Sequence, residues 1–431
     1  MGKYLRLFET HAGYEEARQN LILPNVSYCE DNKDVHFNPL PYQGFCKLTL
    51  NNGSTVELEG SGELSGSMVD SYRETLVSAE IGELCTSIGS NAFSGCTSLT
   101  SVTIPNSVTS IGGSAFKGCS SLEEMYYNAK CELNISFRGW ESAFKKVVIG
   151  NSTPSIGNYV FQGCSSLTSV TIPDSVTSIG NNAFEFCTSL TSVTIPDSVT
   201  SIGSGVFGHC TSLTSVTIGS GVTSIGNNAF INCLAMRELF YNAQCGIDVS
   251  FGFSRGKALE KVVIGNSAPS IGSGAFSACT SLAEVTIGSG VTSIGNSAFY
   301  NCSSLAEVTI GSGVTSIGGG AFASCSGLTS IDMPNSVTSI GEYAFSYCIS
   351  LTSVTIPDSV TSIGEYAFDS CSSLASVRSL AMAAPKIKSS TFQNVKTSGI
   401  LTVPIGSSGY DVWMGTGDYY LGKYNWTKVE Q

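Results

Sequence analysis

The chain has 431 residues and a formal net charge of −12; 42% of its residues are hydrophobic, only 13% are charged, and 47 are glycine. The apolar fraction excludes global disorder, and the acidic excess argues against nucleic-acid binding, which needs stripes of Lys and Arg. No apolar run approaches the roughly 18 residues of a membrane span, so we expect no transmembrane segment. Met1–Glu9 lacks the long apolar stretch of a signal peptide, so any export signal is absent or has been removed.

The N-terminal region, residues 1–75, is richer in charged residues than the rest of the chain. Tyr4–Phe8 predicts a strand and His11–Asn20 a short helix. Cys46–Gly60 alternates apolar and polar residues around an Asn-Gly pair, which predicts a β-hairpin. We therefore expect a small α+β or β region that attaches the chain and covers the first coil of a repeat array beyond residue 75.

A 23-residue repeat makes up that array: Ser166–Cys187 returns almost unchanged as Ser189–Cys210. Two gaps of about two periods each hide a degenerate copy, whose strand survives as KVVIG at Lys146–Gly150 and at Lys261–Gly265. Strand-like segments thus recur from about Ser78 to Val377, which predicts about fourteen coils in one array. The eleven regular copies are marked by Phe-x-x-Cys at Phe93, Phe116, Phe161, Phe184, Phe207, Phe230, Phe276, Phe299, Phe322, Phe345 and Phe368.

One period can be interpreted physically. In Leu190–Ile195 the apolar residues alternate with Ser and Thr, as in a half-buried strand. After a turn and a second inward-facing stretch, Ser204 is placed to cap a single helical turn that carries Phe207 and Cys210 inward. No coil could bury this apolar set alone, so the coils must stack to form a core.

The spacing of the cysteines predicts that most of them pack in the core rather than react or bind a metal. Because eleven of them share one repeat position, we expect a buried column of inert thiols, with occasional disulfides as the alternative. Cys131 and Cys245 occupy matching places in the two degenerate units, which indicates a packing role. No Cys-x-x-Cys pairs with a second pair or with histidines, so we expect no zinc, no other metal and no cofactor.

The sequence contains little that would support a catalytic function. The three histidines are His11, His36 and His209, and no nucleophile elbow, zinc-protease or phosphate-binding motif is present. Asp174 and Asp197 follow the strands of adjacent coils and could share a calcium ion, although a solvated turn is the simpler interpretation. We predict that the chain is not an enzyme and has no catalytic residues.

The core of each repeat resembles the leucine-rich repeat, with Ser198 where that repeat usually has Asn or Cys. The fuller pattern L-T-S-V-T-I-P-x-S-V-T-S-I-G-x-x-A-F-x-x-C resembles the BspA-type repeat of bacterial surface proteins. This resemblance implies a solenoid with a parallel β-sheet on its concave face and short helical turns or loops on its convex face. We divide the chain into the N-terminal region, the solenoid over 76–396 and a C-terminal cap over 397–431.

The two degenerate units interrupt a sheet face that otherwise presents Ser and Thr. By strand alternation their outward residues combine an aromatic ring with opposite charges, as at recognition surfaces. The alternative is that they are merely coils that diverged before a duplication. The predicted binding residues are Glu124, Tyr126, Lys146 and Val148 in the first unit and Glu238, Phe240, Lys261 and Val263 in the second.

These observations favour a non-catalytic binding or adhesion protein. The resemblance implies an extracellular or cell-surface location and a host or microbial surface protein as partner, with a glycan as the alternative ligand. A second hypothesis is a structural or receptor-binding appendage of a phage tail, part of a virion, anchored by residues 1–75.

Overall fold

The structure is a computed structural model that describes residues 26–29, 34–37, 41–135, 143–253, 258–417 and 420–431. The strand expected at Tyr4–Phe8 and the helix expected at His11–Asn20 lie outside these residues. In the part that is described, no helix is long and apolar enough to cross a membrane.

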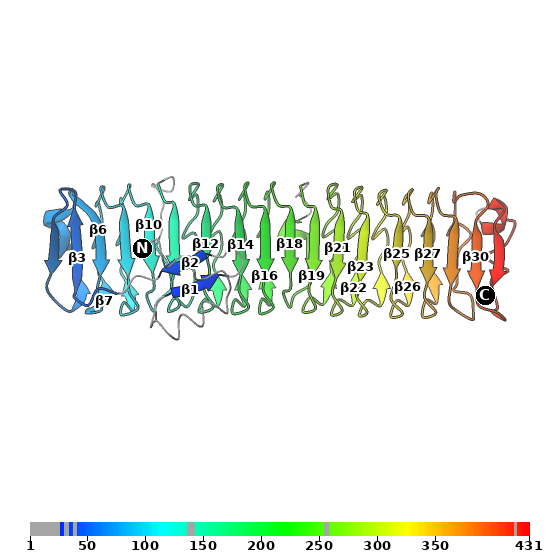
Figure 1. Ribbon diagram of the computed structural model, residues 1–431, viewed down its shortest axis with the longest axis horizontal. Helices are drawn as coiled ribbons and strands as arrows, with labels where there is room; N and C mark the ends of the chain where they lie inside the picture. The colour runs from blue at the N-terminus through cyan, green and yellow to red at the C-terminus, as the bar shows by residue number, and fades with distance from the viewer. Residues whose placement is uncertain (1–25, 30–33, 38–40, 136–142, 254–257, 418–419) are drawn as a thin grey trace, which may run out of the picture.

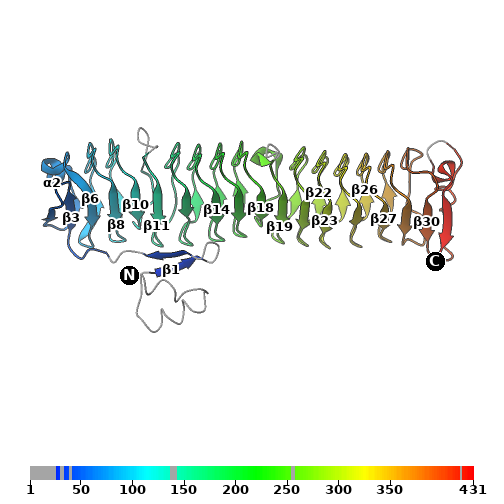
Figure 2. The ribbon, with the colours of Figure 1, turned by 45° about the horizontal axis from the view of Figure 1, so that its top comes forward.

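The predicted solenoid is confirmed: its coils stack along a straight axis, each contributing one long strand to a parallel arrangement (Figures 1 and 2). The strands keep the repeat in register, so that Val193 lies opposite Val216 and Ile195 opposite Ile218. We call the outer surface of these strands the long-strand face. Its fourteen strands from the repeat are β6 (Leu76–Ile81), β8 (Ser101–Ile104), β10 (Glu124–Tyr127), β11 (Lys146–Ile149), β12 (Ser169–Thr171), β14 (Ser192–Ile195), β16 (Ser215–Ile218), β18 (Glu238–Tyr241), β19 (Lys261–Ile264), β21 (Glu284–Ile287), β23 (Glu307–Ile310), β25 (Ser330–Asp332), β27 (Ser353–Ile356) and β29 (Ser376–Ser379).

A second row of short parallel strands lines another side of the solenoid. Hydroxyls between the two rows extend the backbone ladder: Ser198 Oγ donates to the carbonyl of Val176 at 2.9 Å, and Thr200 Oγ1 to that of Thr177 at 3.1 Å. Serine therefore takes over the bonding of the usual Asn or Cys. The short strands are β7 (Cys85–Ile88), β9 (Ser110–Ile111), β13 (Ser178–Ile179), β15 (Ser201–Ile202), β17 (Ser224–Ile225), β20 (Ser270–Ile271), β22 (Ser293–Ile294), β24 (Ser316–Ile317), β26 (Ser339–Ile340) and β28 (Ser362–Ile363).

The third side consists of loops that we call hooks, each running from the Gly to the Cys of the pattern G-x-x-A-F-x-x-C. The prediction of a helical turn in this part of each coil is wrong. Two residues of each regular hook are left-handed, such as Asn182 (φ 56°) and Phe186 (φ 61°), and they reverse the chain. Alternate hook N–H groups consequently point along the solenoid axis, and Phe184 N donates to the carbonyl of Val206 in the next coil at 2.8 Å.

A stack of buried phenyl rings runs through the core behind the hooks. Phe207 is fully buried, with ring centroids 5.3 Å from Phe184 and 5.6 Å from Phe230. The sequence interpretation missed how the stack crosses the degenerate coils. Phe253 continues the column, whereas Phe144 comes from the position that is leucine in regular coils and stacks on its neighbour in the column at 5.8 Å.

The cysteine column packs beside this stack. All eleven thiols are free and buried, and each of several donates to the carbonyl of a column phenylalanine, as Cys210 Sγ does to Phe184 at 3.1 Å. Burial raises the pKa of Cys233 and of Cys279 to about 12, from an ordinary value of 9.0. The expected column of inert thiols is thus present.

The N-terminal end is closed by a short antiparallel hairpin, as the sequence predicted. The strands β3 (Cys46–Leu50) and β4 (Thr55–Leu58) pair with each other, and β3 also pairs with β6. The segments β5 (Gly62–Leu64), α2 (Gly66–Val69) and η1 (Asp70–Tyr72) come next along the chain. A further hairpin that the sequence did not predict joins β1 (Val26–Cys29) to β2 (Asp34–Phe37).

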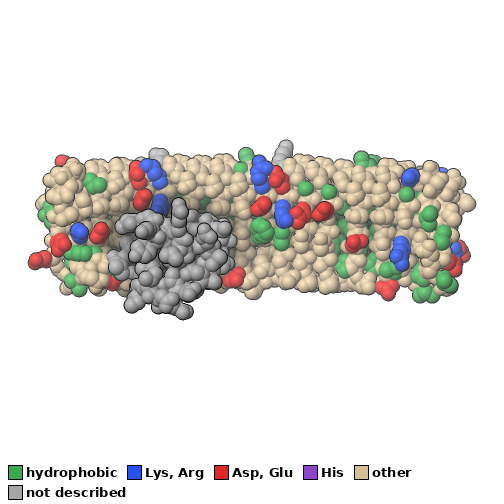
Figure 3. Space-filling model, in the orientation of Figure 1, with side chains coloured by type: hydrophobic (Ala, Val, Ile, Leu, Met, Phe, Trp, Pro, Cys, Tyr) green, Lys and Arg blue, Asp and Glu red, His purple; other side chains and the backbone are tan. Residues whose placement is uncertain are grey.

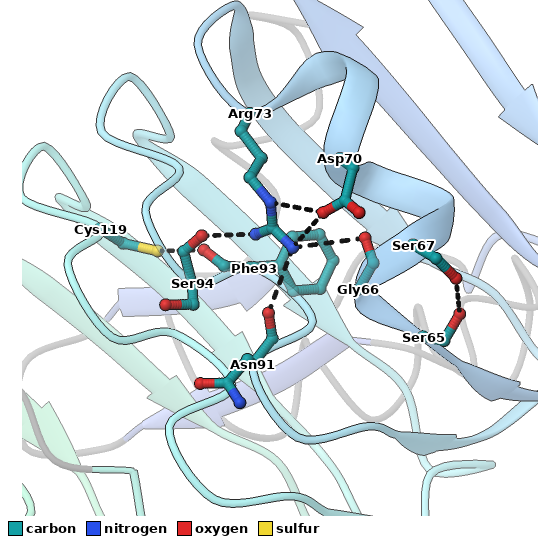
Figure 4. Close-up of polar contacts among 9 residues, drawn as sticks. All are labelled: Ser65, Gly66, Ser67, Asp70, Arg73, Asn91, Phe93, Ser94 and Cys119. Carbon is teal, nitrogen blue, oxygen red and sulfur yellow. Dashed lines mark hydrogen bonds and ion pairs between the residues drawn. The ribbon is translucent and has the colours of Figure 1, made fainter.

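Arg73 satisfies the exposed end of the hook ladder (Figure 4). Hook carbonyls accept bonds from the preceding coil, and the first coil has none before it. The Arg73 guanidinium donates to the carbonyl of Ser94 and, at 3.4 Å, to that of Asn91, while Asp70 holds it at 2.7 Å. Of the carbonyls that a preceding coil would bond, that of Ser94 thus receives its donor from the Arg73 side chain, whereas the carbonyl of Asn91 also accepts from the N–H of Ser94 within the hook.

At the other end the sheet continues into two more parallel strands, β30 (Ile400–Val403) and β31 (Thr427–Glu430), with η4 (Leu421–Tyr424) between them. Trp413 is buried at 5.4 Å from Phe392, the last ring of the column, and its indole N–H donates to the carbonyl of Pro385 at 3.1 Å. The division of the chain at residues 75 and 396 stays a prediction.

Replacing Phe207 by Ala should lower the free energy of unfolding by about 3–5 kcal/mol, because it opens a cavity and interrupts the ring stack. Urea unfolding followed by circular dichroism measures the change. The control is Phe186→Asn at an exposed left-handed hook position, where Asn occurs in other coils. A loss below about 1 kcal/mol for Phe207→Ala would contradict a structural role for the stack.

Arg73→Ala should destabilise the N-terminal coils by about 2 kcal/mol, because it leaves the hook carbonyl of Ser94 without a donor. Hydrogen exchange should rise in residues 85–119 and stay unchanged in the central coils. Arg378→Ala, which removes an exposed arginine from β29, is the matched control. Uniform exchange in both variants would show that Arg73 does not cap the ladder.

Stability should fall steeply as the pH rises from about 9 toward 12. Below the unfolded-state pKa near 9 both states keep their thiols protonated, so the full stability is present. Above it only the unfolded chain ionises, because burial holds the folded pKa near 12, and each thiol costs about 1.4 kcal/mol per pH unit. Urea midpoints between pH 7 and 11 test this.

A triple variant, Cys187→Ala, Cys210→Ala and Cys233→Ala, is the control for the alkaline transition. It should show a shallower pH dependence, since three of the titrating groups are gone. An identical slope would mean that other groups cause the transition.

Candidate binding surface

The eight predicted residues occupy outward positions on four long strands. In the first patch Glu124 and Tyr126 of β10 lie opposite Lys146 and Val148 of β11. The alternating residues, such as Met125, are buried, so strand alternation was predicted correctly.

The second patch repeats this arrangement. Glu238 and Phe240 of β18 lie opposite Lys261 and Val263 of β19, while Leu239 is buried. Five strand steps separate β10 from β18, which corresponds to about 24 Å along the axis.

The two aromatic rings are only half-buried, and therefore less exposed than alternation alone predicts. In the register Tyr126 lies between Thr103 and Val148, so its ring packs between neighbouring side chains. Burial raises the pKa of Tyr126 accordingly. Each ring with its valine thus forms a small apolar step on a hydroxyl-covered face.

A buried tyrosine anchors the strand behind each patch. Tyr127 and Tyr241 take the place of the isoleucine of regular coils and are fully buried. The Tyr127 hydroxyl donates to the carbonyl of Glu132 at 2.9 Å and lies 3.2 Å from Cys131 Sγ. In the second unit the hydroxyl lies 3.2 Å from Cys245 Sγ in the same way. The matching cysteines thus pack around these hydroxyls.

The sequence interpretation missed a second row of charges directly before the strands. Lys145 Nζ lies 2.8 Å from Glu123, and Arg237 pairs with Glu260. The order of charge is reversed between the two patches, acid before base in the first and base before acid in the second. The signal was visible, because charged residues stand there where regular coils have threonine or alanine.

Acidic residues extend the second patch toward the C-terminus. Lys261 Nζ pairs with Glu284 of the following coil at 2.8 Å, and Glu307 lies opposite Glu284 in the next strand. Glu238, which is opposite Lys261 in the register, lies on the other side of Lys261. The bond to Glu284, with the nearby negative charges, raises the pKa of Lys261. Figure 3 shows Lys, Arg, Asp and Glu side chains gathered in two groups along the solenoid, with other charged side chains nearer both ends.

Asp197, at the end of its strand, has a local role. Asp197 Oδ1 accepts a hydrogen bond from the backbone N–H of Ser220 in the next coil at 2.5 Å. His209 stacks on Phe186 with ring centroids 4.5 Å apart. Throughout the described ranges no three His, Cys, Asp or Glu side chains come together in a way that could hold a metal ion.

The repeat geometry agrees with a known family. The profile described as the BspA type leucine rich repeat region matches six copies over residues 71–136, 133–247 and 249–375. The chain belongs to this family. No curated protein sequence matches it significantly.

Solved structures with detectable similarity include other leucine-rich repeat proteins. One from Bacteroides ovatus is 22% identical, with 94% of this chain and 98% of that chain covered and a TM-score of 0.45. A leucine-rich cell surface protein from Faecalibacterium prausnitzii is 29% identical, covering 79% and 95% with a TM-score of 0.30. The pneumococcal vaccine antigen PcpA is 15% identical, covering 90% and 98% with a TM-score of 0.33.

Proposed function

We propose that this protein is a non-catalytic adhesion protein that binds a partner protein through the two patches of its long-strand face. The observation that carries the proposal is the repetition of one arrangement, a ring, a valine and opposite charges, at two places on one rigid face. An apolar step framed by charge offers both contact area and orientation to a partner.

The rigid spacing of the patches supports binding at both together. The long strands and the phenyl stack fix the two patches about five coils apart. A partner with repeated epitopes therefore loses translational and rotational entropy only once when it binds both patches. The reversed charge rows, Glu123 with Lys145 and Arg237 with Glu260, make the two patches similar but not equivalent. Two related but non-identical epitopes on one partner fit this difference.

A location at the bacterial cell surface fits the proposal, with a host or microbial surface protein as partner. The family and the F. prausnitzii cell surface protein support this location. Neither supports the phage-tail alternative. The non-catalytic assignment rests on the site itself, whose residues are ring, valine and ion pairs without a nucleophile beside a base.

The double variant Tyr126→Ser and Phe240→Ser should reduce binding to a partner, or to cells that carry it, at least tenfold. It restores the hydroxyl surface of regular coils and removes the apolar contact of both patches. Since both rings are half-buried, the free energy of unfolding should fall by only about 1 kcal/mol per site. Surface plasmon resonance and thermal unfolding measure the two effects.

The control is Thr309→Ser with Thr355→Ser, at the equivalent outward positions of β23 and β27. It should leave both binding and stability unchanged. Undiminished binding by the double aromatic variant would refute the proposed site. Binding that is lost after enzymatic removal of cell-surface glycans, but not after protease treatment, would identify a glycan as the ligand instead.

A further inference from the structure

We propose a second interaction surface, on the hooks of two C-terminal coils, that binds an arginine-rich segment of a partner protein. Its residues are Glu342, Tyr343, Tyr347, Glu365 and Tyr366, which we call the tyrosine patch. It lies on a different side of the solenoid from the long-strand face and is independent of the function proposed above.

The tyrosines occupy positions that disfavour them. Tyr343, Tyr347 and Tyr366 all have left-handed backbones, with φ of 57°, 59° and 55°. Glycine, asparagine or serine fills most equivalent positions of the other hooks, and these residues tolerate that conformation better. A bulky ring there adds strain without entering the core, which points to a role outside folding.

The rings are available to a ligand. Tyr343 is 45% exposed and Tyr347 is 56% exposed. Tyr366 stacks on one face of Tyr343, with centroids 4.8 Å apart and planes 11° from parallel. In the equivalent position of the preceding coil stands Gly320, so the other face of Tyr343 borders a position without a side chain.

The space above Gly320 is open. A Cβ added at Gly320 would meet only Ser297 Oγ at 3.5 Å and Ala323 Cβ at 3.8 Å within contact range. The amide of Gly320 donates to the backbone carbonyl of Glu342 at 2.7 Å, which places the Glu342 backbone beside this opening. The Glu342 carboxylate is close enough to Tyr343 to raise the pKa of its hydroxyl. A planar guanidinium therefore has room on the ring of Tyr343 with a carboxylate next to it.

The charge of the patch selects a cation. Burial raises the pKa of Tyr343, and Tyr366 and the carboxylates of Glu342, Glu365 and Asp369 raise it further. Asp369 is itself buried, held by Ser370 at 3.2 Å and by other donors. Negative potential at a tyrosine ring favours a guanidinium, which stacks and pairs at once.

The charges of the coils on either side of the tyrosine patch favour one direction of approach for a basic segment. The exposed lysines Lys386 and Lys388 lie in the next coil toward the C-terminus. The hook on the other side, residues 318–325, carries no charge. A basic segment therefore reaches the patch over Gly320, and the net charge of −12 favours its association with the whole chain.

The test measures binding of a labelled peptide of five Arg-Gly units to the full chain by fluorescence anisotropy at low salt. A peptide of five Lys-Gly units is the comparison. The arginine peptide should bind at least about threefold more tightly, because lysine cannot stack as a plane. No binding, or equal affinity for both peptides, would overturn the proposal.

Two variants locate the site. Tyr343→Asn removes the ring and places at this hook a residue that is native at Asn182, so the thermal midpoint should not fall. Glu342→Gln removes one charge. Each should weaken binding of the arginine peptide at least about fivefold. Unchanged affinity in both variants would overturn the proposal.

Two further variants serve as controls. Tyr159→Asn makes the same substitution at the equivalent hook position of a distant coil and should leave peptide binding unchanged. The double variant of Tyr126 and Phe240 should also bind the peptide normally. A loss in Tyr159→Asn equal to that in Tyr343→Asn would show that exposed tyrosines bind the peptide without a defined site.

Discussion

The hydrogen bonds between hooks are the constraint on which the rest of the structure depends. Each hook donates alternate N–H groups to the carbonyls of the next hook, as Phe184 does to Val206. These bonds exist only if successive coils stay in register, and that register places ring on ring and thiol beside thiol. The straight axis, the flat rows of hydroxyls and the fixed spacing of surface features all result from it.

Much of the fold and of the binding surface could be predicted from the sequence, because the same residue pattern recurs in many coils. The coils, the buried column of Phe and Cys and the outward placement of Tyr126 and Phe240 all derive from period and alternation. The hooks could not be predicted, since left-handed conformations at residues such as Phe186 and Tyr343 contradict local preference and are imposed by bonds to the neighbouring coil.

The degenerate coils also contain features that sequence patterns do not predict. Phe144 enters the ring stack from the leucine position, and only three-dimensional neighbours reveal this substitution. The ion partner of Lys261 is likewise set by which of two flanking carboxylates its side chain reaches. Pattern analysis locates such residues on a face, but their pairings depend on side-chain geometry that repeats do not encode.

The ladder also has a polarity. At its N-terminal end the Ser94 carbonyl has no preceding hook and accepts from Arg73 instead. At its C-terminal end the Asn394 N–H has no following hook and donates to the hydroxyl of Tyr424 at 2.9 Å. The regular interior coils, by contrast, are interchangeable. Unequal recombination between such near-identical segments would add or delete whole coils while both ends stay intact, so the molecule can change its length in increments of about 4.8 Å. The distance between the two long-strand patches can thus change only in steps of one coil. Selection could match it to the dimensions of a partner without altering any contact residue.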